Sequence, residues 1–377
     1  MHVNYIDNAC AIYESKGFRL LSDPWLTDGA FEGSWYHEKG KLDNLDWSSI
    51  LSVDALYISH VHPDHYDPAT LSKFRKDIPI YILDTPINFL SGKLIDLGFT
   101  NIRRSKSGDT VLVGPFKITL YAPFSKHPFD DSVLGSFIDS AMVIEDDKKL
   151  ILNANDNTPT EEAAEMLVKN HGVFDQAQLK YSCAGPYPSC FLNLSHDEKL
   201  AEKRRLLTRQ RVSMNRVAEI LGARAVPFAG DYILAGSLAH KNQYLAIEGL
   251  DLTKVPEGKP YDYELDGSPD LDELVSLLHK ARGNLWEKQT LLNFFPDYSV
   301  SINFSFNNYS YCIDFKHDDG CLGRGANLEC YLDPRLLRRI LTKQSHWNNA
   351  EVGCHIDFYR TGPYIPDIST MMSFFHI

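Results

Sequence analysis

The sequence predicts an α/β fold for its first part, and three observations support this. An apolar, β-prone run at 55–59 leads into a loop and then into Asp67-Pro68, which is the pattern of a strand followed by a capped helix. Two β-prone runs, at 141–145 and 150–152, are joined by a short charged turn. A capping sequence at 195–198 begins a long helical stretch. Open α/β folds place their chemistry where such strands end.

Four metal-ligand side chains lie in the loop after the first of these strands: His60, His62, Asp64 and His65. His60 and His62 are two residues apart, so in an extended segment they share a face and can bind one ion through neutral imidazoles. Pro63 turns the chain, so Asp64 and His65 can serve a second ion close by. Imidazole nitrogen with carboxylate oxygen suits zinc, iron or manganese, with positions left open for an activated water. The alternative interpretation is three surface histidines beside a helix cap, and this spacing disfavours it.

The motif at 60–65 resembles the signature of the metallo-β-lactamase superfamily. The resemblance implies an αβ/βα sandwich that holds two divalent metal ions at the edges of its sheets. It also implies three further ligands: a downstream histidine, an aspartate after a later strand that bridges both ions, and a final histidine. We expect Asp156 to be the bridging aspartate, because it lies where the strand at 150–152 ends. An ordinary loop rich in Asn and Asp is the alternative.

The downstream histidine is expected at His127, which follows a predicted strand at 116–121. It precedes Asp156 by a stretch that is usual in the superfamily. Two nearby aspartates, Asp130 and Asp131, are rival ligands, and an exposed loop histidine is the plain alternative.

The final histidine is expected at His240, which follows the apolar segment 225–230. His196 competes with it but lies at the capped start of a helix. Zinc is the expected metal, with iron and manganese as alternatives. The predicted metal ligands are therefore His60, His62, Asp64, His65, His127, Asp156 and His240.

Four short segments give a closer resemblance, to the cytidine-monophosphate N-acetylneuraminate hydroxylase family. They lie at 23–27, 57–62, 182–188 and 227–230, in the order found in that family, and the likeness covers residues 1–250 with gaps. That family also carries an N-terminal Rieske iron–sulfur domain, which needs Cys-x-His and Cys-x-x-His pairs. Neither pair occurs in this sequence. We therefore expect that this chain does not perform Rieske-dependent hydroxylation alone.

The ligand set predicts a hydrolase with two metal ions, in which Asp64 and Asp156 have catalytic roles. A metal-bound hydroxide would attack a small polar, anionic substrate, such as a sugar, sugar phosphate or nucleotide sugar. The first alternative is a di-iron oxygenase on the same scaffold, which a carboxylate in place of His127 would favour, since carboxylate-rich ligation favours iron. The second alternative is a metal-bound interaction protein without catalytic activity, whose mark would be a broken ligand set.

Candidate substrate-binding residues are Tyr187, Asp231, Arg204 and Arg205. The two arginines belong to a basic stretch of the predicted helix, for which a solvated face is the plainer explanation and an anion-binding patch the functional one. Asp231 follows a glycine and is equally well explained as a turn residue. The basic stretch comprises Lys199, Lys203, Arg204, Arg205, Arg209, Arg211 and Arg216.

Composition narrows the class of protein. A net charge of −12 disfavours a nucleic-acid partner. The sequence has no apolar run of about 18 residues and no visible signal peptide, so we expect no membrane partner and a cytoplasmic protein. The seven cysteines are scattered, and we expect them to stay reduced. The sequence leaves a homo-oligomer open.

A chain of 377 residues with 44% hydrophobic content can bury one large core and an appended unit. We place the boundary so that 1–250 form the metallo-β-lactamase-like catalytic domain and 251–377 a C-terminal α+β domain. The apolar tail at 374–377 is expected to dock in a core.

The second part shows its own pattern of elements. Ser268 is expected to cap a helix that reaches Leu292. Alternating runs at 300–306 and 309–315 predict a pair of antiparallel strands. Asp333, followed by proline, begins another predicted helix.

Overall fold

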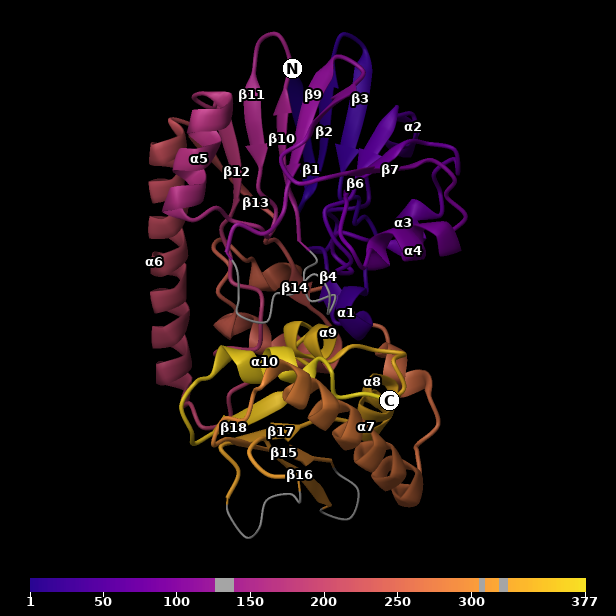
Figure 1. Ribbon diagram of the computed structural model, residues 1–377, viewed down its shortest axis with the longest axis vertical. Helices are drawn as coiled ribbons and strands as arrows, with labels where there is room; N and C mark the ends of the chain where they lie inside the picture. The colour runs from indigo at the N-terminus through magenta and orange to yellow at the C-terminus, as the bar shows by residue number, and fades with distance from the viewer. Residues whose placement is uncertain (126–138, 305–308, 319–324) are drawn as a thin grey trace.

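Two six-stranded sheets pack face to face in the computed structural model, which describes residues 1–125, 139–304, 309–318 and 325–377 (Figure 1). The first sheet has the order β1-β2-β3-β5-β6-β7, and β3, β5 and β6 run parallel. Because parallel strands end at the same edge, the residues that follow β3 and β5 lie near one another. Its strands are β1 (His2–Asp7), β2 (Cys10–Ser15), β3 (Phe18–Ser22), β5 (Ala55–Tyr57), β6 (Ile80–Leu83) and β7 (Ile102–Ser105).

The second sheet has the order β13-β12-β11-β10-β9-β8. The strands β10 and β11 form an antiparallel hairpin, as predicted from the charged turn between them. The strands β11, β12 and β13 are parallel neighbours, so their carboxyl ends share one edge. The bounds are β8 (Thr110–Val113), β9 (Phe116–Tyr121), β10 (Ala141–Glu145), β11 (Leu150–Asn153), β12 (Gln176–Lys180) and β13 (Arg224–Phe228).

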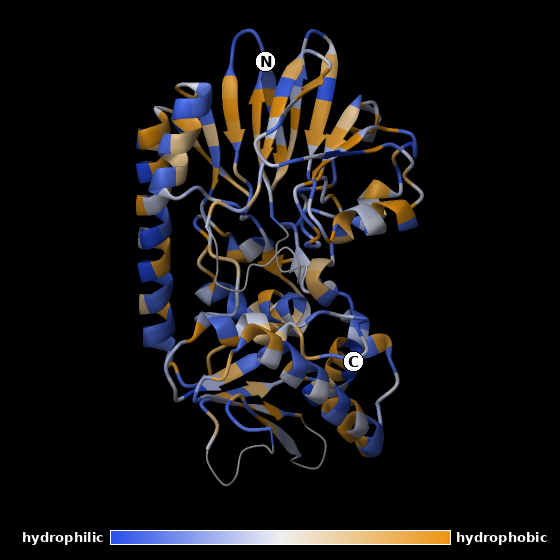
Figure 2. Ribbon diagram, viewed as in Figure 1, coloured by the Kyte–Doolittle hydropathy of each residue, from blue (hydrophilic) through white to orange (hydrophobic). Residues whose placement is uncertain are grey.

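Helices cover the outer face of each sheet (Figure 1), and apolar side chains fill three layers. The layer between the sheets includes Tyr57, Phe116 and Met142. The strands of both sheets are largely hydrophobic in Figure 2, as strands covered on both faces must be. The first sheet packs on α2 (Trp47–Leu51), α3 (Pro68–Leu71) and α4 (Phe89–Asp96), and the second on α5 (Glu161–His171) and α6 (His196–Leu221). The predicted αβ/βα sandwich is therefore confirmed.

Two helix starts follow from their capping residues as the sequence predicts. Asp67 accepts a hydrogen bond from the N–H of Ala69 at the start of α3, whose first residue is Pro68. Ser195 and Glu198 form a reciprocal capping box at the start of α6. These caps fix where the loop after β5 ends and where the long helix begins.

The C-terminal part is an α+β unit with a four-stranded sheet in the order β16-β15-β17-β18. The predicted antiparallel pair is present as β15 and β16. The start of the first helix differs from the prediction, because the carboxylate of Asp270, and not Ser268, accepts the N–H of Glu273. The unit contains α7 (Leu271–Leu292), β15 (Ser299–Asn303), β16 (Ser310–Asp314), β17 (Leu328–Tyr331), α8 (Pro334–Leu341), α9 (Trp347–Val352), β18 (Asp357–Arg360) and α10 (Pro366–Met372).

Short elements connect the sandwich with this unit. The two-residue strands β4 (Trp35–Tyr36) and β14 (Ile233–Leu234) pair with each other. The remaining pieces are α1 (Ala30–Gly33) and the 3-10 helices η1 (Gly236–Tyr244), η2 (Leu252–Lys254) and η3 (Asp262–Leu265).

One hydrophobic core includes residues from both sides of position 250. Trp25 and Trp35 belong to it together with Leu278 and Phe375, so the apolar tail is docked as expected. Trp35 stacks on Tyr232 with ring centroids 3.3 Å apart. Its indole nitrogen donates a hydrogen bond to the carbonyl of Val352 in α9, at 3.2 Å. The division at residue 250 stays a prediction.

Two further expectations concern thiols and membranes. Cys312 is disulfide-bonded, so the expectation that all the cysteines stay reduced is wrong at this residue. The scattered spacing of cysteines in the sequence does not show which sulfur atoms approach in the fold. Among the described helices, none is both long and apolar enough to cross a membrane.

Candidate metal centre

A tight turn after β5 carries the motif at 60–65. The backbone N–H groups of His65 and Tyr66 both donate to the carbonyl of His62, at 3.0 and 2.8 Å. The chain therefore reverses over Pro63, and Asp64 and His65 return toward His60. The side chain of His60 is buried, whereas His62 is half-buried. The strand end and the helix cap at Asp67 together hold this loop at the sheet edge.

The first group of metal-ligand atoms joins His60 and His62 to Asp139. All three ligand atoms lie within 4.8 Å of one another. Nε2 of His60 is 3.0 Å from Nδ1 of His62 and 3.4 Å from Oδ1 of Asp139. Two imidazoles and one carboxylate are thus available to one ion.

Asp139 was not among the predicted ligands, although the register of the predicted hairpin indicates its position near Asp156. Met142 pairs with Asn153 in the antiparallel ladder of β10 and β11. Continuing this register places Asp139, before β10, opposite Asp156, after β11. Both carboxylates therefore lie at the edge where the motif loop emerges.

The second group joins His60 and His65 to Asp156, again with all ligand atoms within 4.8 Å of one another. Nε2 of His65 lies 3.4 Å from Oδ2 of Asp64 and 3.9 Å from Oδ1 of Asp156. Asn155 has a φ of 52°, in the left-handed region that Asn tolerates, and this turn follows the end of β11. Five of the predicted ligands, His60, His62, Asp64, His65 and Asp156, are therefore together in one cluster.

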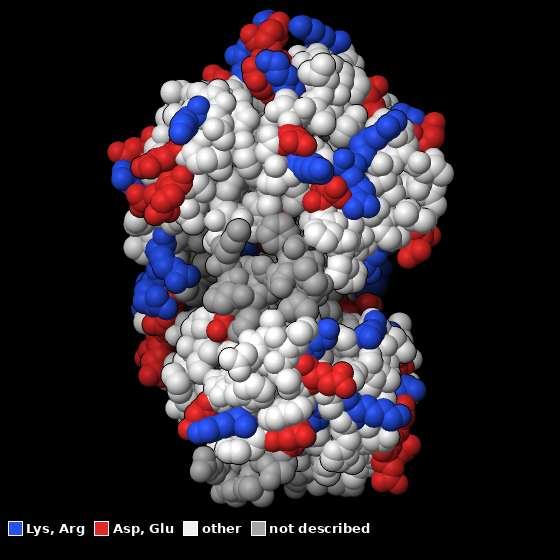
Figure 3. All heavy atoms as spheres, viewed as in Figure 1, with Lys and Arg blue, Asp and Glu red and all other residues white. Residues whose placement is uncertain are grey.

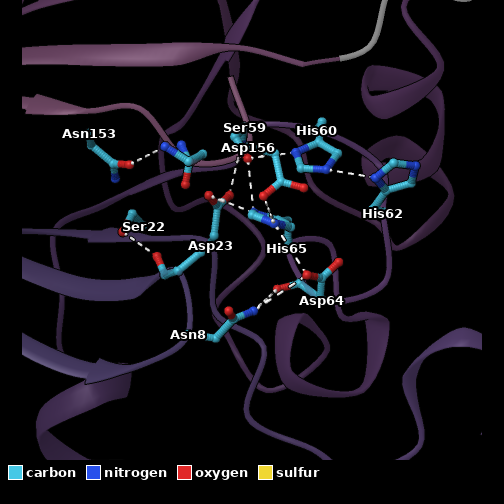
Figure 4. A network of polar contacts seen from close by, with 12 residues as sticks. Asn8, Ser22, Asp23, Ser59, His60, His62, Asp64, His65, Asn153 and Asp156 are labelled. Carbon is cyan, nitrogen blue, oxygen red and sulfur yellow. Dashed lines mark hydrogen bonds and ion pairs between the residues drawn. The ribbon is translucent and has the colours of Figure 1, made fainter. Parts of the chain in front are cut away.

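Polar groups behind the cluster fix the orientation of two imidazoles (Figure 4). Oγ of Ser59 lies 2.9 Å from Nδ1 of His60 and 3.2 Å from Nδ1 of His65. Oδ2 of Asp23 lies 3.1 Å from the same Nδ1 of His65, and its Oδ1 accepts the N–H of Ser59 at 2.7 Å. Figure 4 shows His65 between Asp23 and Asp64. The Nε2 atoms are consequently directed toward the centre, the arrangement in which an outer carboxylate supports a histidine ligand.

Burial and neighbouring charges shift the pKa values of these groups. Burial lowers the pKa of His60 well below its ordinary value, and the positive charges of His65, His62 and Lys180 add to the effect. Burial opposes the charged form of His65, but Asp64 and Asp23 outweigh it and raise that pKa. Burial, with the nearby charge of Asp156, raises the pKa of Asp139.

The residues present fit a bound metal ion. Nε2 of His65 and Oδ1 of Asp139 are buried, and neither has a hydrogen-bond partner among the described residues. A buried polar atom without a hydrogen-bond partner lowers the free energy of unfolding by about 1–3 kcal/mol. A cation bound by the first group would satisfy Oδ1 of Asp139, and imidazole nitrogens with carboxylate oxygens are suitable donors for zinc or iron.

Lys180 is a member of the site that sequence reasoning missed. It is the last residue of β12, and its Nζ lies 3.1 Å from Oδ2 of Asp156. Burial disfavours its charged form, but the carboxylates of Asp156, Asp64 and Asp139 outweigh burial and raise its pKa. The only signal in the sequence was its place at the end of a strand, because the adjacency of β12 to β11, the strand before Asp156, is a property of the folded sheet.

The two other predicted ligands are not part of this cluster. His127 lies outside the described residues, as do its rivals Asp130 and Asp131. His240 is exposed in η1, where its Nδ1 lies 2.8 Å from the carbonyl of Ser237, and it belongs to neither group of ligand atoms.

Among the predicted substrate residues, Asp231 has a route of contacts to the cluster. Its carboxylate is paired with Lys41, and its N–H donates to Oδ1 of Asn8 at 3.2 Å. Nδ2 of Asn8 in turn lies 3.5 Å from Oδ2 of Asp64.

The other three predicted substrate residues lie on or beside α6. Arg204 and Arg205 are exposed, and Arg205 pairs with Glu202 of the same helix at 2.7 Å. Tyr187 packs edge-on against Phe191, with centroids 5.0 Å apart. Along the left edge of Figure 3, where α6 lies, positive and negative side chains are next to one another.

Comparison with known proteins gives one family model and several relatives. Residues 2–180 match the model of the beta-lactamase superfamily domain. A protein of Mycolicibacterium smegmatis that is named for a Rieske 2Fe-2S iron–sulfur centre is 31% identical over 199 residues, which are 51% of this chain and 36% of that protein. A Mycobacterium tuberculosis protein with the same kind of name is 31% identical over 256 residues, 64% of this chain and 46% of that protein.

The cytidine monophosphate-N-acetylneuraminic acid hydroxylase of Danio rerio is 42% identical over 88 residues, which are 22% of this chain and 14% of the enzyme. The chain thus spans less than half the length of each of these relatives. A solved structure, that of CmlA, a diiron beta-hydroxylase from Streptomyces venezuelae, has 17% identity and a TM-score of 0.43, covering 67% of this chain and 48% of CmlA. The family match over residues 2–180, the motif at 60–65 and the two-sheet sandwich, which continues to β13, show that this part of the chain has the metallo-β-lactamase fold and is related to that superfamily.

Proposed function

We propose that this chain is a metal-dependent oxygenase that binds an iron ion through His60, His62 and Asp139 and acts on a small polar, anionic molecule. The observation that carries the proposal is the composition of this group, two histidines and one carboxylate. That set is characteristic of non-haem iron oxygenases. The names of the relatives, a hydroxylase and proteins named for a Rieske centre, agree with oxygen chemistry.

The residues of the chain prepare the site for the metal. Iron, when bound, supplies the one-electron chemistry that dioxygen requires. Ser59 and Asp23 hold the imidazoles of His60 and His65 in place, so their Nε2 atoms stay directed inward. Lys180 supplies a fixed positive charge next to Asp156, which favours an anionic substrate.

Hydroxylation by dioxygen also needs electrons from elsewhere. Inserting one oxygen atom into a C–H bond consumes two electrons and two protons and releases one water. We propose an iron–sulfur protein as the donor, which the names of the mycobacterial relatives support. We further propose a small-molecule substrate, rather than a nucleic acid or membrane, and a cytoplasmic location.

A metal-dependent hydrolase, the function predicted first from the sequence, is the second candidate. Catalytic zinc sites also use two histidines and one carboxylate. The half-buried cation of Lys180 favours this chemistry as well, because it would stabilise negative charge that develops on a substrate.

Metal analysis with an oxygen assay separates the two candidates. The full chain is produced with zinc, iron and manganese supplied in equal amounts, and bound metal is measured by mass spectrometry. We expect iron to dominate, and the reduced protein to consume oxygen faster than its His60→Ala variant, which should lose the ion. Dominant zinc, with ester or phosphoester hydrolysis and no oxygen consumption, would establish the hydrolase instead.

The same measurement tests the predicted final ligand. The exposed His196 provides a matched control, since it lies at the start of α6 and contacts Tyr244. We expect His196→Ala and His240→Ala to keep the full metal content. Loss of metal in His240→Ala alone would restore His240 to the ligand set.

A further inference from the structure

The edge formed by β12 and β13 offers a lysine, and no metal-binding side chain at the two positions directly after β13. The strand β12 ends at Lys180, and its parallel neighbour β13 ends at Phe228. Ala229 and Gly230 follow, and neither has a side chain that binds metal. A Cβ on Gly230 would lie 2.3 Å from Oγ of Ser182, so the packing here leaves no room for a donor side chain.

The carboxylate of Asp156 is divided between two partners. Oδ1 lies 3.9 Å from Nε2 of His65, and Oδ2 lies 3.1 Å from Nζ of Lys180. A carboxylate that bridges two metal ions uses one oxygen for each. The ammonium group of Lys180 already holds the oxygen that a second ion would need.

We propose that Lys180 replaces a second metal ion, so that the chain binds one ion tightly, through His60, His62 and Asp139. The proposal rests on the proposed metal-dependent function and specifies it further. A divalent ion near Asp156 would repel the ammonium at short range. It would also have to displace the half-buried ion pair of Lys180 with Asp156 and leave the lysine without its partner, which is unfavourable.

Metal stoichiometry tests the proposal without an activity assay. The metal-free full chain is titrated with Zn²⁺ against a competing chelator and with Fe²⁺ under anaerobic conditions. The variants are Lys180→Met, which removes the charge, Lys180→Arg, which keeps it, and Lys41→Met as the control. Lys41 is also an ion-paired lysine, with the carboxylates of Asp7 and Asp231 as its partners, but it is not paired with a residue of either ligand group.

We expect one tight equivalent for the wild type, Lys180→Arg and Lys41→Met. Lys180→Met should bind a second equivalent at least tenfold more tightly than the wild type does. Circular dichroism establishes that each variant is folded, and Lys180→Gln replaces Lys180→Met if the latter is not. The d–d spectrum of the Co²⁺ protein, which should saturate at one equivalent in the wild type, provides an independent reading.

Each result bears on a distinct claim. Two ions of similar affinity in the wild type, or no second ion in either uncharged variant, would overturn the role of Lys180 and leave the proposed function standing. A folded wild-type chain that binds no ion would overturn the proposed function itself.

Discussion

The hydroxyl group of Ser59 should be a strong determinant of metal affinity, although it is not itself a ligand. Ser59 is buried, and its Oγ lies 2.9 Å from Nδ1 of His60, the histidine that belongs to both groups of ligand atoms. His65 keeps a second partner for its Nδ1 in Asp23. The variant Ser59→Ala therefore removes the support of His60 more completely than that of His65.

Two separate effects of Ser59→Ala can be estimated. Loss of an outer hydrogen-bond partner of a metal-binding histidine usually lowers metal affinity about 10- to 100-fold, which corresponds to about 1.4–2.7 kcal/mol. In the metal-free protein, Nδ1 of His60 is left buried without this partner, which should lower the free energy of unfolding by about 1–3 kcal/mol. The first effect is measured by chelator competition and the second by chemical denaturation.

Ser189→Ala is the matched control for Ser59→Ala. Ser189 is also a buried serine, but its hydroxyl donates to the carbonyl of Pro186 at 3.1 Å. We expect this control to lose stability without losing metal affinity. If folded Ser59→Ala binds metal within twofold of the wild type, the reasoning that Ser59 orients His60 is wrong.

Three further predictions concern pH, packing and surface charge. Burial lowers the pKa of His355 to about 4, so this imidazole stays neutral in the folded chain. In the unfolded chain the same imidazole takes up a proton once the pH falls below its ordinary pKa. Stability from this residue is present above about pH 6.5 and is lost as pH falls to about 4, by about 3 kcal/mol; denaturation across this range should show a smaller pH dependence in His355→Gln, and an unchanged one would refute the assignment. A Cβ on Gly258 would lie 2.3 Å from the backbone nitrogen of Gly236, whereas one on Gly267 would meet open space. Gly258→Ala should therefore lower the unfolding free energy by about 1–3 kcal/mol and Gly267→Ala by much less, and equal thermal shifts would contradict this. The double variant Arg204→Ala with Arg205→Ala should raise the Kd for pyrophosphate less than threefold at physiological salt, because both side chains are exposed and Arg205 is already paired; a larger, salt-sensitive rise would assign α6 to the binding surface.

What the sequence predicted well was local. The motif at 60–65 lies within a single loop, and its ligand character depends only on spacing and on the strand before it. Asp156 follows a strand directly, and the caps at Asp67 and Ser195 involve residues at most three positions apart. Short-range hydrogen bonds determine such features, so the sequence pattern is sufficient to predict them.

What the sequence missed depends on the order of strands in the sheets. Asp23 follows β3 and Lys180 ends β12, and they reach the cluster because β3 adjoins β5 and β12 adjoins β11. Periodicity shows that a segment is a strand but does not show which strands are neighbours. Asp139 is the exception, since the register of the predicted β10–β11 hairpin placed it opposite Asp156.

The C-terminal part contributes to the metal centre through α1. Phe31 and Glu32 adopt positive φ angles of 51° and 59°, which side chains other than glycine rarely take. Contacts from the C-terminal part hold both residues: Nε2 of His355 lies 2.9 Å from the carbonyl of Phe31, and Arg339 pairs with Glu32 at 3.4 Å. The ring of Phe31 lies 6.1 Å from that of His62. Strained backbone of this kind persists only where the surroundings fix it. The C-terminal part therefore holds α1 in the conformation that places the ring of Phe31 beside His62, although it contributes no residue to either group of ligand atoms.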